Sequence, residues 1–225
     1  MRMRRKKRLE ERLEACSSLI LKINREDLNI NNAITKQQIF NSKEIFNNDN
    51  PVHLEIGCGK GQFIYEIAQL NPNINYVAVE KTQNVIVTAL EKIIESDIKN
   101  IRFIDCEAEY LENYFPPASI EKLYLNFSCP FPKNRDAKHR LTHENYLKIY
   151  KKILKPGSEI HMKTDNTSFF EFTINSLSGF GYTLKNVTLD LHKSGFEGNI
   201  ITEYEKRFSD MGCPIYRLEA VFPIK

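Results

Sequence analysis

Three closely spaced glycines stand in the segment Glu55-Ile56-Gly57-Cys58-Gly59-Lys60-Gly61. Glycines at this spacing let the backbone turn sharply and approach a ligand where any side chain would collide. The segment is not a phosphate-binding P-loop, because Gly61 is followed by Gln62 and the Gly-Lys-Ser/Thr ending is missing. It also differs from the GxGxxG pattern of dinucleotide-binding folds. We interpret it as a ligand-binding turn and call it the glycine loop.

Acidic residues accompany three successive apolar runs around the glycine loop. Glu80 ends the second run, 80 − 55 = 25 positions after Glu55. A carboxylate at that place can accept hydrogen bonds from both ribose hydroxyls of an adenosine. Glu107 and Ala108 follow the third run and are placed to face the adenine edge. Together these residues favour an adenosine-containing ligand.

Apolar runs alternate with amphipathic stretches after Pro51, a pattern typical of alternating strands and helices. We therefore predict an α/β fold with a doubly wound, mostly parallel sheet and an antiparallel strand near the C-terminus. In such sheets the ligand lies at the carboxyl ends of the strands, where the strand order reverses. The predicted strands are 52–56, 76–79, 101–104, 123–127, 158–163, 182–191 and 216–222, and the predicted helices are 62–70, 83–95, 144–154 and 168–177.

The first fifty residues have a different character. The net charge of +3 is too small to identify a polyanionic partner, but the cations are clustered. Apolar residues at helical spacing predict an amphipathic helix over 9–23, and the asparagine-rich stretch 28–50 is interpreted as a linker. We divide the chain into a basic arm, helix and linker (1–50) and one α/β domain (51–225). The arm's cations are Arg2, Arg4, Arg5, Lys6, Lys7 and Arg8.

The five cysteines are far apart in the sequence and have no metal-ligand spacing, so we predict neither a metal site nor a disulfide framework. The basic start lacks the apolar core of a signal peptide, and no stretch is long enough to span a bilayer. We expect a cytoplasmic protein without a membrane partner.

The glycine loop together with Glu80 resembles the cofactor motifs of Rossmann-type class I methyltransferases, which use S-adenosyl-L-methionine. The segment Asn126-Phe127-Ser128-Cys129-Pro130-Phe131-Pro132-Lys133 narrows this resemblance to the bacterial tRNA (guanine-N7-)-methyltransferase family. Two further motifs of that family, Thr164-Asp165-Asn166 and Thr202-Glu203-Tyr204-Glu205, follow in the expected order. The resemblance covers residues 48–223.

The resemblance implies methyl transfer to N7 of a guanine in the tRNA variable loop, at position 46 in tRNA numbering. It implies that 51–225 is the methyltransferase domain and that Cys129 occupies the position of the family's catalytic aspartate. The implied cofactor-binding residues are Glu55, Gly57, Gly59, Gly61, Glu80, Glu107 and Ala108, and the implied substrate-binding residues are Lys133, Asp165, Thr202, Glu203, Tyr204 and Glu205.

The chemistry of guanine N7 bears on the missing aspartate. N7 carries a lone pair and no proton, so its attack on a methyl group needs no general base and depends mainly on alignment. We hypothesise that Asp165 or Glu205 accepts hydrogen bonds from the guanine N1 and N2 donors. Cys129 then either fills the aspartate's place as a small buried residue or acts as the nucleophile of an RNA cytosine-C5 methyltransferase. A non-catalytic tRNA-binding protein is a third interpretation.

A second basic run follows the fourth predicted strand, at the predicted ligand edge of the sheet. We expect Arg135, Lys138 and Arg140 to contact the RNA backbone, because phosphate contacts supply affinity while base contacts supply specificity. No heptad or interface stripe is present, so the sequence leaves a monomer and a homodimer open.

Overall fold

Continuous apolar runs in the first half of the chain form buried parallel strands, as the sequence predicts. Strands β1 (Val52–Ile56), β2 (Asn75–Val79) and β3 (Ile101–Ile104) pair in the order β3-β2-β1. Every residue of β1 and β2 is buried, which is typical of parallel strands covered on both faces. The computed structural model describes residues 4–23 and 38–223, and its contacts divide the chain into two units, Met1–Pro116 (unit 1) and Pro117–Lys225 (unit 2).

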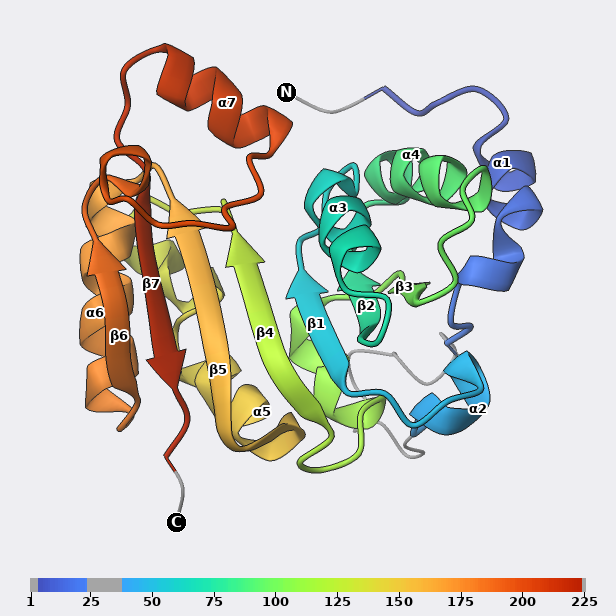
Figure 1. Cartoon of the computed structure of the whole chain (residues 1–225), viewed down its shortest axis with the longest axis horizontal. Coiled ribbons are helices and arrows are strands. Elements are labelled where there is room, and N and C mark those ends of the chain that lie inside the picture. The colour runs from blue at the N-terminus through green and yellow to red at the C-terminus, as the bar shows by residue number, and fades with distance from the viewer. Residues whose placement is uncertain (1–3, 24–37, 224–225) are drawn as a thin grey trace. The chain divides into compact units, whose positions relative to one another are not determined.

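Among the described residues, unit 1 contains the α-helices α1 to α4 (Figure 1). Helices α3 (Gln62–Leu70) and α4 (Gln83–Ile94) follow β1 and β2 and bury their apolar sides, as predicted. The arm contributes α1 (Leu9–Ala15), which packs on α4, and α2 (Ser42–Phe46) lies within the stretch predicted as a linker. That short helix begins at Asn41, whose side chain accepts a hydrogen bond from the Lys43 backbone N–H.

The helix predicted over 9–23 is wrong in its second half. It ends at Ala15, and after a 3₁₀ turn Ile20 forms a parallel bridge with Phe103 of β3. Two serines follow Cys16, and their hydroxyls compete for backbone hydrogen bonds, which weakens the helix there. Pairing with the edge of β3 then replaces helical hydrogen bonds. Of the predicted linker, 28–50, residues 28–37 lie outside the described residues.

Unit 2 holds a mixed sheet with strand order β4-β5-β7-β6. Strands β4 (Ile120–Asn126) and β5 (Leu154–Thr164) are parallel, whereas β7 (Tyr216–Val221) runs antiparallel to both β5 and β6 (Thr183–Thr188). The predicted antiparallel strand near the C-terminus is therefore present. The helices of unit 2 are α5 (Glu144–Ile153), α6 (Thr167–Gly179) and α7 (Glu203–Asp210).

Alternation along β5 gives the unit 2 sheet two different faces. Ile160 and Met162 are fully buried on the apolar face, and α5 and α6 lie along one side of the sheet (Figure 1). Glu159, His161 and Lys163 occupy the opposite, polar face. Helix α7 was not predicted as a helix, and it follows the motif that begins at Thr202.

None of the described helices is long and apolar enough to cross a membrane. The predicted division of the chain after residue 50 stays a prediction. The described part of the arm packs on α4 and belongs to unit 1.

Candidate functional site

The glycine loop leaves the end of β1 and is tied to the end of β2. The backbone N–H groups of Gly57 and Cys58 both donate to the Val79 carbonyl, over 2.8 and 3.1 Å. Gly61 has φ +79°, and a Cβ added there would lie 2.6 Å from the Ala89 Cβ of α4. Glycine at this position therefore permits both the turn and the close approach of α4.

The other two glycines leave open space. A Cβ at Gly57 or Gly59 would meet no heavy atom within 4 Å. Both residues have positive φ, so the loop exposes backbone rather than side chains there. That open side is where a ligand can approach the loop.

Glu80 is held beside the glycine loop by two backbone donors. Its Oε1 accepts from the Thr82 N–H at 2.9 Å, and its Oε2 accepts from the Gly59 N–H at 3.3 Å. Glu55 is buried at the end of β1. Burial, together with the charges of Glu55 and Glu80, raises the pKa of Cys58 well above its ordinary value. The structure thus gathers two of the predicted acids at one end of the unit 1 sheet.

The third predicted acid is more exposed. The carboxylate of Glu107 lies 3.9 Å from the Lys81 ammonium, with about half of its side chain accessible. Ala108 is buried at the start of the 3₁₀ segment that follows. Glu107 is therefore free to rotate toward a ligand at the end of β3, whereas Ala108 offers its backbone.

In unit 2, the loop after β4 has an unusual backbone. Phe127 and Phe131 have φ of 52° and 41°, a region that non-glycine residues seldom occupy. Non-glycine residues held in this region commonly occur at functional sites, because surrounding contacts must hold them there. Cys129 lies between them and is exposed. The expectation of a buried thiol at this position is therefore wrong, because Cys129 lies in an exposed part of this loop.

Arg140 supplies contacts that hold this loop. Its Nε donates to the Pro130 carbonyl at 3.0 Å, its Nη2 donates to the Phe131 carbonyl at 3.0 Å, and the guanidinium stacks over Phe172. The side chain is buried, so we correct the expectation of a phosphate contact and assign Arg140 to loop structure. Lys133, Arg135 and Lys138 are exposed, as a role in RNA binding requires.

The Thr202-Glu203-Tyr204-Glu205 motif forms the first turn of α7. Thr202 Oγ1 accepts from the Glu205 N–H at 3.1 Å, which caps the helix. Glu203 and Tyr204 are exposed, whereas Glu205 has no accessible surface. Motif residues that were predicted as one substrate-binding group therefore have different environments.

Asp165 and Tyr204 lie together near the carboxyl end of β5. The Tyr204 hydroxyl is 3.5 Å from Asp165 Oδ1, and the Tyr204 ring lies 4.9 Å from the Phe127 ring. Burial and the Asp165 carboxylate both raise the pKa of Tyr204, so its hydroxyl keeps its proton near neutral pH. Phe127 was not predicted as a site residue, and its backbone conformation is not visible in the sequence. The Tyr204 ring also stacks on the Phe208 ring, with 4.5 Å between the ring centroids, and 44% of the residue remains exposed. This group therefore presents a half-buried carboxylate next to a partly exposed aromatic ring.

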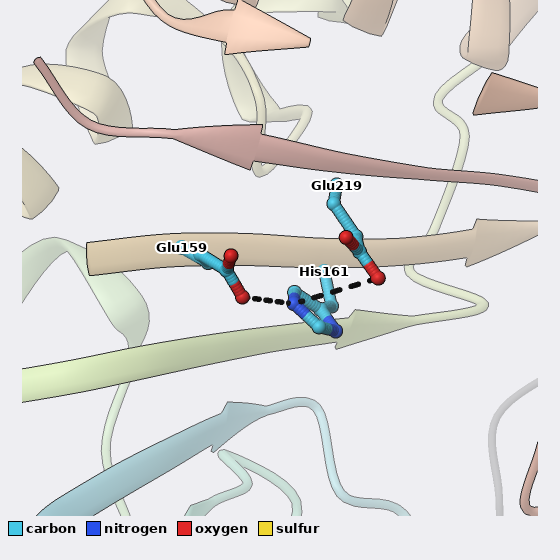
Figure 2. A group of neighbouring side chains, drawn as sticks. All are labelled: Glu159, His161 and Glu219. Carbon is cyan, nitrogen blue, oxygen red and sulfur yellow. Dashed lines mark hydrogen bonds and ion pairs between the residues drawn. The ribbon is translucent and has the colours of Figure 1, made fainter. Parts of the chain in front are cut away.

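One further cluster of polar side chains lies on the polar face of the unit 2 sheet. Figure 2 shows the Glu159 and Glu219 carboxylates on either side of the His161 imidazole. His161 Nε2 lies 2.7 Å from Glu159 Oε2 and 3.9 Å from Glu219 Oε1. Burial and the nearby Lys122 charge lower the pKa of His161, so the ring is neutral at pH 7.

The possible ligand atoms of Glu159, His161 and Glu219 lie within 4.8 Å of one another, but this closeness does not by itself make a metal site. Lys122 lies 3.2 Å from Glu159, and Arg217 is hydrogen-bonded to Glu219, so each carboxylate already faces a cation. A divalent ion would have to displace both cations. We assign the cluster to pairing between β4, β5 and β7.

The described part of the arm is attached to α4. The Lys6 backbone N–H donates to Asn84 Oδ1 at 2.8 Å, and the Lys6 ammonium contacts the Thr88 hydroxyl. Arg12 donates two hydrogen bonds of 2.6 and 2.7 Å to Glu91. The remaining described cations of the arm stay exposed. They are Arg4, Arg5, Lys7 and Arg8, while Arg2 lies outside the described residues.

Comparisons with known proteins identify similar sequences and structures. Residues 49–218 match the family described as "Putative methyltransferase". The chain is 47% identical over 222 residues to the tRNA (guanine-N(7)-)-methyltransferase of Listeria monocytogenes, covering 99% of both chains. It is 50% identical over 182 residues to the enzyme of that name from a Geobacillus species, covering 81% of this chain and 83% of that one.

A structural likeness agrees with these matches. The 16S rRNA methyltransferase KamB superposes with a TM-score of 0.59 at 16% identity, covering 81% of this chain and 93% of that one. A sequence identity of 16% supports a shared fold but carries no conclusion about a shared function. It confirms the predicted fold class.

Proposed function

Because the chain belongs to the family of tRNA (guanine-N(7)-)-methyltransferases, we propose that it methylates N7 of a guanine in tRNA, using S-adenosyl-L-methionine. The target within tRNA is proposed to be position 46 of the variable loop. The structural observation that carries the proposal is the pairing of Asp165 with the exposed ring of Tyr204. A purine can stack on such a ring while the carboxylate accepts its donors.

The unit 1 residues fit the cofactor. The glycine loop is open at Gly57 and Gly59, where a side chain would otherwise fill space, and Glu80 is fixed beside it. Carboxylates suit both the ribose hydroxyls and the positive sulfonium of this cofactor. S-adenosyl-L-methionine supplies the electrophilic methyl group. We propose that Glu55, Glu80 and Glu107 hold it, with the backbone of the three loop glycines and of Ala108.

The unit 2 residues fit a guanine. We propose that Asp165 accepts hydrogen bonds from guanine N1 and N2, which adenine cannot donate in the same pattern. Tyr204 provides a stacking surface, and an aromatic ring of this kind contributes about 1–3 kcal/mol per stacked base. Thr202 shapes the first turn of α7, while Lys133 and Glu203 contact the substrate from exposed positions.

Catalysis then rests on alignment and electrostatics. Guanine N7 attacks with its own lone pair and loses no proton, so no general base is needed. The guanine becomes more positive as the methyl group is gained, and a carboxylate at N1 and N2 binds this state more tightly than the starting state. An exposed Cys129 is compatible with such a reaction.

The product of the reaction tests this proposal. We expect wild type and Cys129→Ala to convert unmodified tRNA to 7-methylguanosine at rates within about threefold of each other, since no step requires a thiolate. Methyl transfer from labelled cofactor would be followed by nucleoside digestion and mass spectrometry. Formation of 5-methylcytidine by wild type, lost in Cys129→Ala, would instead establish the cytosine-C5 reaction. Tight binding of cofactor and tRNA without any product would establish the non-catalytic interpretation.

The exposed basic run predicts salt-dependent tRNA binding. Replacing Arg135 and Lys138 with glutamine is expected to weaken tRNA binding and to reduce the slope of log K against log salt by about 2, one for each lost phosphate contact. Lys151→Gln is the control. This lysine is exposed, but it lies in α5 just before the amino end of β5, whereas ligands bind at the carboxyl ends of the strands. Filter binding at several salt concentrations measures both slopes. An unchanged slope in the double variant would refute the assignment.

We further propose that the protein acts in the cytoplasm, where unmodified tRNA is available. The exposed cations of the arm would add contacts to tRNA. The proposed activity is compatible with either a monomer or a homodimer, since both proposed ligand regions consist of residues from one chain.

A further inference from the structure

A buried lysine lies two residues before Asp165. Lys163 is only 5% exposed, and its ammonium donates to three acceptors in unit 2. These are Asn199 Oδ1 at 3.0 Å, the Ile200 carbonyl at 2.8 Å and Glu205 Oε2 at 2.7 Å. All three hydrogen-bonding capacities of the ammonium are thus used inside the protein.

The partner carboxylate is just as fully engaged. Glu205 Oε1 accepts from Asn199 Nδ2 at 2.6 Å and lies 3.2 Å from His192 Nε2, while its Oε2 faces Lys163. A carboxylate with no accessible surface and with donors on both oxygens is not available to a guanine. Of the two acids considered for base recognition, only Asp165 is placed to touch the base.

The contacts of this buried pair join three segments of unit 2. Lys163 belongs to β5, Asn199 and Ile200 to the connection before α7, and Glu205 to the first turn of α7. Glu205 is the neighbour of Tyr204, and Lys163 is close in sequence to Asp165. The pair therefore fixes the first turn of α7 against the end of the strand that carries Asp165.

Stability alone does not explain such a pair. Removing two charges from water costs about as much as their attraction returns, and an apolar replacement is often equally stable. What charged hydrogen bonds add is direction, because each donor must meet its acceptor at a defined distance and angle. Sub-ångström placement is what stacking and base recognition require.

We propose that Lys163 and Glu205 are positioning residues, which set the distance between Tyr204 and Asp165 and thereby orient the target guanine. This inference rests on the proposed function. It adds a role for Lys163, and it changes the role of Glu205 from contacting the base to holding the residue beside it.

The main test uses the paired variant Lys163→Met/Glu205→Gln, which removes both buried charges together and keeps similar side-chain volumes. We expect its affinity for S-adenosyl-L-methionine to match wild type and its melting temperature to fall modestly, because the Ile200 carbonyl loses a donor. Its single-turnover methylation rate at saturating tRNA should fall at least tenfold. A matched control, Lys122→Met/Glu159→Gln, removes another ion pair from the same face of the sheet and should leave that rate within twofold.

Combining the paired variant with Tyr204→Ala distinguishes a positioning role of the buried pair from a purely structural one. In wild type, Tyr204→Ala is expected to slow methylation at least tenfold, whereas in the paired variant the same change should add less than threefold, because the ring is already misplaced. Fully additive effects, or a paired variant as fast as wild type, would overturn the inference. Wild type that makes no 7-methylguanosine would instead overturn the proposed function on which it rests.

Asn199→Ala provides a second route that leaves both charges in place. It removes one hydrogen bond from Lys163 and one from Glu205. We expect a threefold to tenfold fall in the single-turnover rate and faster hydrogen exchange in a peptide covering 203–208. If this variant exchanges and reacts as wild type does, the buried cluster does not position α7.

Discussion

A Gly61→Ala variant is expected to bind S-adenosyl-L-methionine at least tenfold more weakly than wild type. The new Cβ would lie 2.6 Å from the Ala89 Cβ, closer than two carbon atoms can approach without a shift of the backbone. The left-handed conformation adds about 1–2 kcal/mol and overpacking about 1–3 kcal/mol. The loop and α4 must move apart to relieve this contact, and a shift of the loop moves the backbone that we propose faces the cofactor.

A control variant separates the steric clash with Ala89 from the cost of placing alanine in a left-handed conformation. Gly181 also has a positive φ, of 91°, but a Cβ there meets nothing within 4 Å. Gly181→Ala should therefore destabilise the protein slightly and leave cofactor affinity unchanged. Isothermal titration of both variants, with thermal melting, checks the pair. Equal cofactor affinities would mean that the contact with Ala89 does not position the loop.

The unit 1 strands are predictable because their signal is local. A parallel strand covered on both faces is apolar throughout, as β1 and β2 are, and this pattern needs no knowledge of the rest of the chain. The position of the glycine loop is also predictable from sequence, since a left-handed backbone next to a strand strongly favours glycine. Helix α1 shows the limit. Its apolar spacing continues to Ile23, but pairing of Ile20 with β3 ends it early.

The unit 2 site depends on contacts that sequence spacing does not reveal. Arg140 stands in a basic run and was predicted to contact phosphate, yet the carbonyls of Pro130 and Phe131 take its donors. Glu205 was predicted to contact the base, yet Lys163 reaches it from 42 positions away. For both Arg140 and Glu205, the sequence gives the charge of the side chain, but its burial and its hydrogen-bond partners depend on the fold.

Helix α7 was missed for a related reason. Its eight residues are mostly charged or polar, and only Phe208 and Tyr204 offer apolar surface. The sequence Thr202-x-x-Glu205 is a signal for it, because Thr-x-x-Glu is typical of a helix start, and the Thr202 side chain does cap α7. The same four residues therefore serve as the start of a helix as well as a family motif.

Asp165→Asn is expected to lower kcat/KM for tRNA methylation about 10- to 100-fold. The loss corresponds to about 1.5–3 kcal/mol for a hydrogen bond to a charged acceptor. Asparagine keeps the shape of the side chain, so the capping of α6 by Asn166 and the contact with Tyr204 are preserved in outline. The fall should appear mainly in kcat, because the carboxylate binds the methylated, more positive guanine better than the starting base.

The target base itself provides the sharpest check on this assignment. Inosine lacks the N2 amino group, so a tRNA carrying inosine at the target position removes one of the donors assigned to Asp165. Wild type should prefer guanosine over inosine by about 1–3 kcal/mol, or roughly 5- to 150-fold in kcat/KM. Asp165→Asn should reduce that preference to a few-fold, since its amide cannot accept from both donors. A preference that survives the substitution intact would mean that another group reads the amino edge of guanine.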